Sequence, residues 1–205
     1  MGSEMCIRDS HGALRNGAGF SPGNVGQAFS LDGSTGFVDI PDAPALRPVS
    51  LTLEAWVAFD AIPGIRVVFD KLAGTGINTS YALWLENGSL RGAVGDATAR
   101  GPVLSVGFSP VPGRFYHLAY TFDDGAKRQT LYLDGSSVAT GTVANAIGYD
   151  AQPLLLGRGR QNGTANFFLQ GRIDEAAIYN RALNGVEIAL LYNAGPAGKH
   201  LRTRT

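Results

Sequence analysis

Short apolar stretches recur along the chain from about Val25, separated by Gly, Asp, Asn and Pro. This pattern is typical of an antiparallel all-β domain. In the stretch 51–59 the odd-numbered positions are all apolar, whereas the even-numbered positions include Glu54 and Trp56. The odd positions are therefore expected to face the core. The stretch 114–122 has apolar side chains on both faces, which predicts a strand in the middle of a sheet.

Two dipeptides, Asn87-Gly88 and Asp134-Gly135, predict tight β-hairpins. Asn, Asp and Gly tolerate the positive φ angles that two-residue hairpin turns require. Gly171 is predicted to mark a β-bulge in the last strand. Further strands are expected at 66–72, 81–86, 90–94, 130–133, 137–140, 153–157 and 167–179. Roughly a dozen strands in all indicate a two-sheet jelly roll, an antiparallel β-sandwich.

One short helix is expected near the carboxyl end of the chain. Asn184 can cap its first backbone amides, and Glu187, three residues later, can return the bond in a capping box. Leu183 and Ile188 are spaced for a hydrophobic staple. The pair Gly195-Pro196 should end the helix.

Composition excludes several classes of partner. The 205 residues carry 17 Lys and Arg against 17 Asp and Glu, and no dense basic run points to nucleic acid. No apolar run approaches the roughly 20 residues that a membrane-spanning helix needs, so membrane insertion is not expected. The single cysteine, Cys6, excludes an intramolecular disulfide and a thiolate metal cage.

The chain is interpreted as one domain at residues 20–195. Residues 1–19 show neither strand alternation nor an amphipathic period, and we expect a disordered or non-native leader there. Residues 196–205 are basic and aperiodic, and we expect a disordered tail. Nothing between these ends indicates a linker or an internal repeat.

Four segments in this order, 28–41, 53–57, 115–118 and 171–183, resemble the laminin-G-like jelly roll of the concanavalin A-like lectin/glucanase superfamily. The hairpin at Asp134-Gly135 and the closing helix complete the resemblance. It implies an accessory module of secreted or cell-surface proteins that often binds carbohydrate and often carries a calcium ion. Fold and function are separable, so the resemblance does not by itself fix one function.

The resemblance also implies a structural calcium site. Asp32 and Asp174 match two acidic positions of the family pattern, and they are expected to share one ion with the carbonyl of Gly33. In the alternative interpretation, Asp32 only forms a turn and Asp174 accepts backbone hydrogen bonds.

Sugar binding requires an aromatic face together with polar groups that bond to hydroxyls. Trp84 lies on the opposite strand face from Tyr81, Leu83 and Leu85, and is the candidate ligand ring. Trp56 is expected to pack in the core. Loops at the ends of a sandwich often carry function, although a solvated loop is the alternative here. The polar loop contributes four candidate ligand contacts: Arg158, Arg160, Gln161 and Asn162.

The five glutamates are widely separated, and the clustered Glu-x-Asp-x-x-Glu motif of glycosidases in the superfamily is absent. His117 has no Ser, Cys or second His beside it that would make a catalytic or metal site. We therefore expect a non-catalytic module that binds a glycan or a cell-surface protein. Such a module would work outside the cell or at its surface, within a larger multidomain protein. A spacer or protein-interaction module without sugar affinity is the alternative, and a glycoside hydrolase is the remote one.

Overall fold

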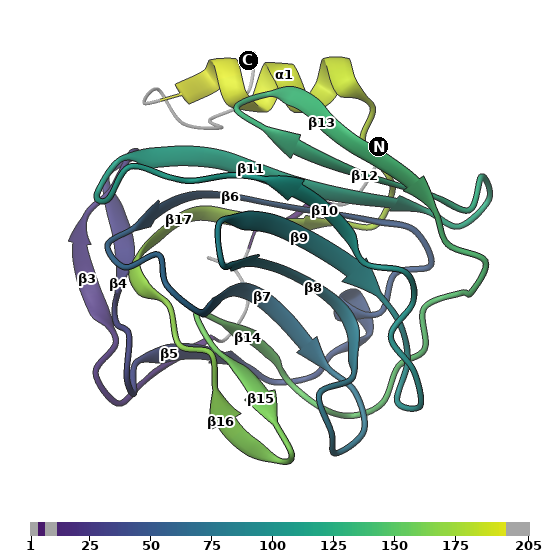
Figure 1. Ribbon diagram of the computed structural model, residues 1–205, viewed down its shortest axis with the longest axis horizontal. Helices are drawn as coiled ribbons and strands as arrows, with labels where there is room; N and C mark the ends of the chain where they lie inside the picture. Colours follow the sequence, from purple (N-terminus) through teal and green to yellow (C-terminus); the bar gives the residue numbers. More distant parts are fainter. Residues whose placement is uncertain (1–3, 7–11, 196–205) are drawn as a thin grey trace, which may run out of the picture.

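The computed structural model describes residues 4–6 and 12–195, and it is a sandwich of two large antiparallel sheets with one α-helix (Figure 1). The predicted all-β, two-sheet fold is confirmed. The described residues form 17 strands, more than the expected dozen, because several edge strands are only three or four residues long. The expected tail at 196–205 lies outside the described residues, as do 1–3 and 7–11.

The first sheet has eight strands, and seven of them follow the order β13-β12-β11-β6-β17-β4-β3, with β1 also paired to β17. Its strands are β1 (Glu4–Cys6), β3 (Gly19–Pro22), β4 (Gln27–Asp32), β6 (Leu51–Phe59), β11 (Phe115–Asp123), β12 (Arg128–Leu133), β13 (Ser136–Thr142) and β17 (Gln170–Tyr179). One edge of β17 is shared, because β4 pairs with residues 170–173 and β1 with residues 177–179. The predicted central position of β11 is confirmed, since it pairs with β6 and β12.

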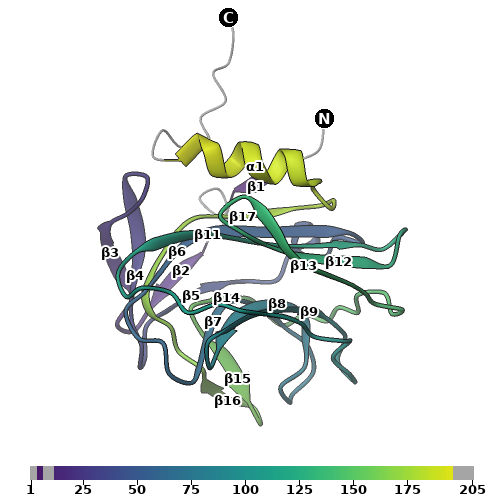
Figure 2. The same ribbon diagram turned by 45° about the horizontal axis from the view of Figure 1, so that its top comes forward.

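The second sheet has seven strands in the order β10-β9-β8-β7-β14-β5-β2. They are β2 (Ala13–Arg15), β5 (Phe37–Ile40), β7 (Ile65–Leu72), β8 (Thr79–Glu86), β9 (Ser89–Val94), β10 (Leu104–Gly107) and β14 (Leu154–Leu156). A short 3-10 helix, η2 (Pro44–Leu46), precedes β6. A separate hairpin of β15 (Gly159–Gln161) and β16 (Thr164–Asn166) projects beyond the outer side of this sheet (Figures 1 and 2).

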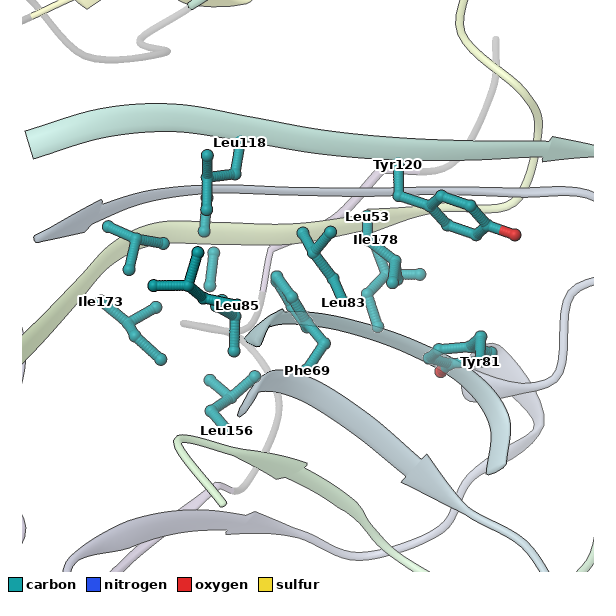
Figure 3. Packing of buried hydrophobic residues seen from close by; sticks show 14 of the residues in the cluster. Leu53, Phe69, Tyr81, Leu83, Leu85, Leu118, Tyr120, Leu156, Ile173 and Ile178 are labelled. Atoms are coloured by element: carbon teal, nitrogen blue, oxygen red, sulfur yellow. The ribbon is translucent and has the colours of Figure 1, made fainter. Parts of the chain in front are cut away.

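The main core lies between the two sheets, where apolar side chains from both interdigitate (Figure 3). The odd-numbered positions of β6 all point into it, as their alternation predicts. From the other sheet, Tyr81, Leu83 and Leu85 of β8 contribute fully buried side chains. Burial on this scale, rather than a disulfide, is what stabilises the sandwich.

Helix α1 (Gly185–Ala194) lies across the outer face of the eight-stranded sheet (Figure 2). Its start is as predicted, because the Asn184 side chain accepts the amides of Val186 and Glu187 and completes a capping box. Leu183 and Ile188 pack into a second apolar cluster beneath the helix, as the staple predicts. From β6, the ring of Trp56 reaches the helix and stacks on Tyr192 at 5.6 Å.

The two predicted hairpin turns are confirmed. Asn87 and Asp134 each have φ of 47°, and the glycine that follows each has φ of 77°. A third turn, at Asn162-Gly163, has φ values of 51° and 77° and joins β15 to β16. The polar loop expected at this point is therefore a hairpin.

Two expectations about strands are corrected. The bulge in β17 falls between Asp174 and Ala177, where Glu175 has φ of 47°, and not at Gly171. Gly171 is instead a point of close approach, since a Cβ atom there would lie 2.0 Å from the carbonyl oxygen of Ala58. The expected leader also contains strands. β1 pairs with β17 in the first sheet, β2 pairs with β5 in the second, and β3 begins at residue 19. Strands of three or four residues are too short to show an alternation of apolar and polar side chains, so the sequence gives no signal for them.

No helix in the described part of the chain is long and apolar enough to cross a membrane.

Candidate functional site

A pocket of about 290 Å³ lies on the outer face of the seven-stranded sheet, where strands β7, β8 and β9 run side by side. The β15–β16 hairpin and the loops that follow β7 and β9 form its walls. Its lining combines an apolar floor with charged and polar groups. The lining residues are Ile65, Val67, Asp70, Ile77, Thr79, Ala82, Trp84, Glu86, Arg91, Arg100, Arg160, Gln161 and Phe167.

Trp84 forms the aromatic part of the floor. Strand alternation turns it away from the core, as the sequence predicts, and it packs on Val67, Ala82 and Ala93. The side chain is only 5% exposed, since the guanidinium carbon of Arg100 lies 5.1 Å from the centre of its ring. Its indole N–H donates to Oε2 of Glu86 at 3.0 Å. Arg100 therefore occupies the ring face that a sugar would stack on.

Glu86 and Arg91 form an ion pair at the rim of the pocket, with 2.9 Å between Oε2 and Nη1. Arg100 is anchored from the other side, because one of its Nη atoms donates to the carbonyl of Ile77. The Nε atoms of both arginines are buried and have no hydrogen-bond partner. Two cationic side chains thus approach the pocket with donors still unused.

Asp70 of β7 is the most deeply placed charged group of the pocket, with 9% of its surface exposed. Its Oδ1 atom has no hydrogen-bond partner. Burial raises the pKa of this carboxyl to about 7, against the opposing influence of the Thr79 hydroxyl and of nearby arginines. The group is therefore poised to gain or lose a proton near neutral pH.

Arg160 of β15 ties the hairpin to the loop that follows β7. Its Nε donates to the carbonyl of Gly76 at 3.1 Å, and one Nη donates to the carbonyls of Ala73 and Gly74 at 3.3 and 2.7 Å. These bonds satisfy most of the guanidinium. Arg160 thus shapes the pocket wall rather than offering free donors to it.

The structure brings three of the candidate ligand residues to this pocket, namely Trp84, Arg160 and Gln161. The other two lie outside its lining. The guanidinium carbon of Arg158 sits 4.2 Å from the centre of the Phe37 ring. Asn162 occupies the turn between β15 and β16, where its positive φ closes the hairpin.

Sequence reasoning missed Asp70, Glu86, Arg91 and Arg100. The strand 65–72 also carries Arg66 and Lys71, so its charges did not single out Asp70. Arg100 follows β9 in a loop with no pattern of its own, and only the fold places it over Trp84.

The calcium site that the family resemblance implies does not fit the residues present. Gln170 of β17 is paired with Asp32. Asp174 is four residues farther along β17, so it lies about 13 Å from the position opposite Asp32 at the usual strand rise. Oδ1 of Asp32 accepts three backbone amides, and its Oδ2 accepts two hydroxyl groups. Asp32, Gly33 and Asp174 cannot share one ion.

Asp174 has the role that the alternative interpretation gave it. Its two carboxylate oxygens accept the amides of Val25 and Glu175 at 2.7 and 2.8 Å. Across residues 12–195, no three His, Cys, Asp or Glu side chains converge as metal ligands would.

Trp56 is 8% exposed and lies beneath α1, between His117 and Tyr192. It is therefore packed, as predicted, but under the helix rather than between the sheets.

A family model described as the concanavalin A-like lectin/glucanases superfamily, of the laminin G type, matches residues 32–189. The chain belongs to this superfamily. A search of curated proteins returns no match.

Solved structures similar to this superfamily member include receptor-binding domains of botulinum neurotoxins. The serotype C1 binding domain aligns with a TM-score of 0.71 and 12% identity over 90% of this chain and 47% of that one. The binding domain of neurotoxin DC in complex with SialylT gives 0.67 and 13%, over 90% and 46%. The same toxin's domain with rat synaptotagmin II gives 0.69 and 12%, over 90% and 46%. This chain spans less than half of each, and identities this low show a common fold alone.

Proposed function

We propose that this chain is a non-catalytic binding module whose pocket beside Trp84 holds a sugar unit of a glycan. It would act outside the cell or at its surface, within a longer protein. The observation that carries the proposal is one pocket in which an apolar floor meets buried polar atoms without partners, Asp70 Oδ1, Arg91 Nε and Arg100 Nε. Buried polar atoms are normally paired, so such a set favours a ligand that pairs them.

The size of the pocket supports a small ligand unit. The volume of about 290 Å³ is just below the roughly 300–1,000 Å³ range of small-molecule sites. The apolar surfaces of Ile65, Val67 and Phe167 would cover the hydrophobic face of a sugar ring. Two structural neighbours are complexes, one with SialylT and one with rat synaptotagmin II, which agrees with a binding role for the fold.

The arrangement of carboxyl groups favours binding over hydrolysis. Asp70 is paired with Ala82, and Glu86 lies four residues farther along β8, about 13 Å at the usual rise. The Glu86 carboxylate is also held by Arg91 and by the Trp84 N–H. A retaining glycosidase needs two carboxyl groups about 5–5.5 Å apart.

A glycan array probed with the full chain tests the proposal. The informative variant is Arg100→Ala, and the matched control is Arg114→Ala, which also removes an arginine stacked on an aromatic ring, Tyr116. We expect binding to a defined set of glycans, at least tenfold weaker in Arg100→Ala and retained in Arg114→Ala. Since Asp32 and Asp174 do not share an ion, binding should be equal in calcium and in chelator.

Two results would overturn the proposal. A folded chain that binds no glycan would favour the spacer or protein-interaction module. Release of new reducing ends from a bound glycan would instead establish an enzyme.

A further inference from the structure

We propose that the pocket selects a sugar that carries a carboxylate, and that Arg100 and Arg91 bind this carboxylate when Asp70 is protonated. This inference rests on the proposed function, and it names the ligand class and the residue that controls it.

The charges of the pocket favour an anion. Three arginines line it against two carboxyl groups, so the pocket is net positive whether or not Asp70 is ionised. Glu86 is engaged by Arg91, and Arg160 is engaged by backbone carbonyls. Within the described part of the chain no ion pair joins Arg100 to a carboxylate; Arg100 donates to the Ile77 carbonyl and lies over the Trp84 ring.

The free donors also match a carboxylate in shape. A guanidinium presents parallel N–H groups that fit the two oxygens of a carboxylate, and such charge-assisted bonds are stronger than those between neutral groups. Nε of Arg100 and Nε of Arg91 are both buried without a partner. A neutral sugar hydroxyl would satisfy one donor but would leave the positive charge uncompensated.

Asp70 opposes this ligand when it is ionised. It lines the same pocket, and Oδ1 has no partner to neutralise it. A second anion beside it would be repelled, whereas the neutral acid can donate a hydrogen bond to the ligand. The charged groups around Asp70 are Glu86 of β8, Arg91 of β9, Arg100 of the loop after β9, Arg160 of β15, and Arg158, which directly precedes β15.

Binding should therefore be coupled to proton uptake near neutral pH. Burial holds the pKa of Asp70 at about 7. For such a group the protonated fraction rises from about one tenth at pH 8 to about nine tenths at pH 6. If only the protonated form admits the carboxylate, the affinity should rise about tenfold over this interval.

The test uses D-glucuronate and D-glucose as a matched pair of probes. Each is titrated into the ¹⁵N-labelled full chain, and the indole N–H resonance of Trp84 is followed at pH 6 and pH 8. We expect a saturable shift with D-glucuronate, about tenfold tighter at pH 6, and a response to D-glucose at least tenfold weaker. Arg100→Gln should abolish the response to D-glucuronate, and Arg114→Gln should retain it.

Asp70→Asn tests the proton itself, because asparagine has the shape of the neutral acid but does not titrate. This variant should bind D-glucuronate equally at both pH values, with the affinity that the wild type shows at pH 6. A pH dependence that persists in Asp70→Asn would overturn the role of Asp70.

D-glucose binding as tight as D-glucuronate would overturn the acidic specificity and leave the proposed sugar site standing. No shift with D-glucuronate at pH 6 would also overturn this inference, while the glycan array decides separately whether the module binds sugar.

Discussion

Oε2 of Glu54 lies 2.8 Å from Nε2 of His117, and both side chains are fully buried beneath α1. The other oxygen of Glu54 accepts the hydroxyl of Tyr179 at 3.0 Å. Breaking a buried pair of this kind costs stability, because removing one side chain leaves the other buried without its partner.

Glu54→Ala should therefore destabilise the fold by about 3–5 kcal/mol, as measured by urea unfolding. Asp124→Ala is the control, since it removes a carboxylate from a solvent-accessible pair with Lys127 and should cost at most about 1 kcal/mol. Equal losses in the two variants would show that the Glu54–His117 contact does not stabilise the fold.

Trp56→Ala should cost about 3–5 kcal/mol in the free energy of unfolding, because it leaves a cavity under α1. The ring is stacked on Tyr192 at 5.6 Å and meets His117 edge-on at 5.4 Å. Glycan binding at the pocket should be unchanged at temperatures where the variant is folded. A loss of binding with no loss of stability would instead make Trp56 a ligand contact.

Asp32 should make the fold sensitive to acid. Hydrogen bonds from the backbone amides of Gly36, Ser34 and Thr35 hold the pKa of Asp32 well below its usual range. A carboxyl with a lowered folded pKa contributes stability above its unfolded pKa of about 4, and this stability is lost as the pH falls further.

Asp32→Asn should therefore lower stability at neutral pH and flatten the loss of stability below about pH 4. Urea unfolding midpoints of the variant and the wild type, measured from pH 6 down to the lowest pH at which the chain is still folded, check this. Parallel curves for the variant and the wild type would contradict the assignment.

Gly171→Ala should destabilise the chain by about 3 kcal/mol or more, because the added Cβ would collide with the backbone of β6. φ at this position is 149°, where side chains are rarely accommodated. Gly107 of β10 is the matched control, since open space surrounds it. Thermal unfolding of Gly107→Ala should stay near the wild type.

Features that depend on neighbours in the sequence could be predicted. The alternation in 51–59 gave the inward face of β6, and the Asn-Gly and Asp-Gly dipeptides gave two hairpins. The cap at Asn184 was equally local. In each case a residue and its near neighbours carry the whole physical cause.

Features that depend on pairing between distant parts of the chain could not be predicted from the sequence. The Asn162-Gly163 turn carries the same signal as Asn87-Gly88, but its flanking strands are three residues long, largely exposed and without alternation. Similarly, the register of β17 against β4 separates Asp32 from Asp174, which are expected from the sequence to share one ion.

The pocket could be predicted from the sequence only in part. Alternation within β8 predicts the outward direction of Trp84, and this is what the structure has. Asp70 reaches the same pocket because β7 pairs with β8, and Arg100 reaches it through a loop. The candidate ring was thus accessible from sequence, whereas its charged neighbours were not.

Strand β17 is the last to be synthesised, yet it lies between β6 and β4. The chain must emerge from the ribosome as far as residue 179 before β17 can pair with β6 and β4. Until then, each of these two strands has an unpaired edge. The nascent domain is therefore open through its middle for nearly the whole of its translation, a period in which such edges invite association with other chains. Once β17 has emerged it closes the sheet, and α1 can then lie across the outer face.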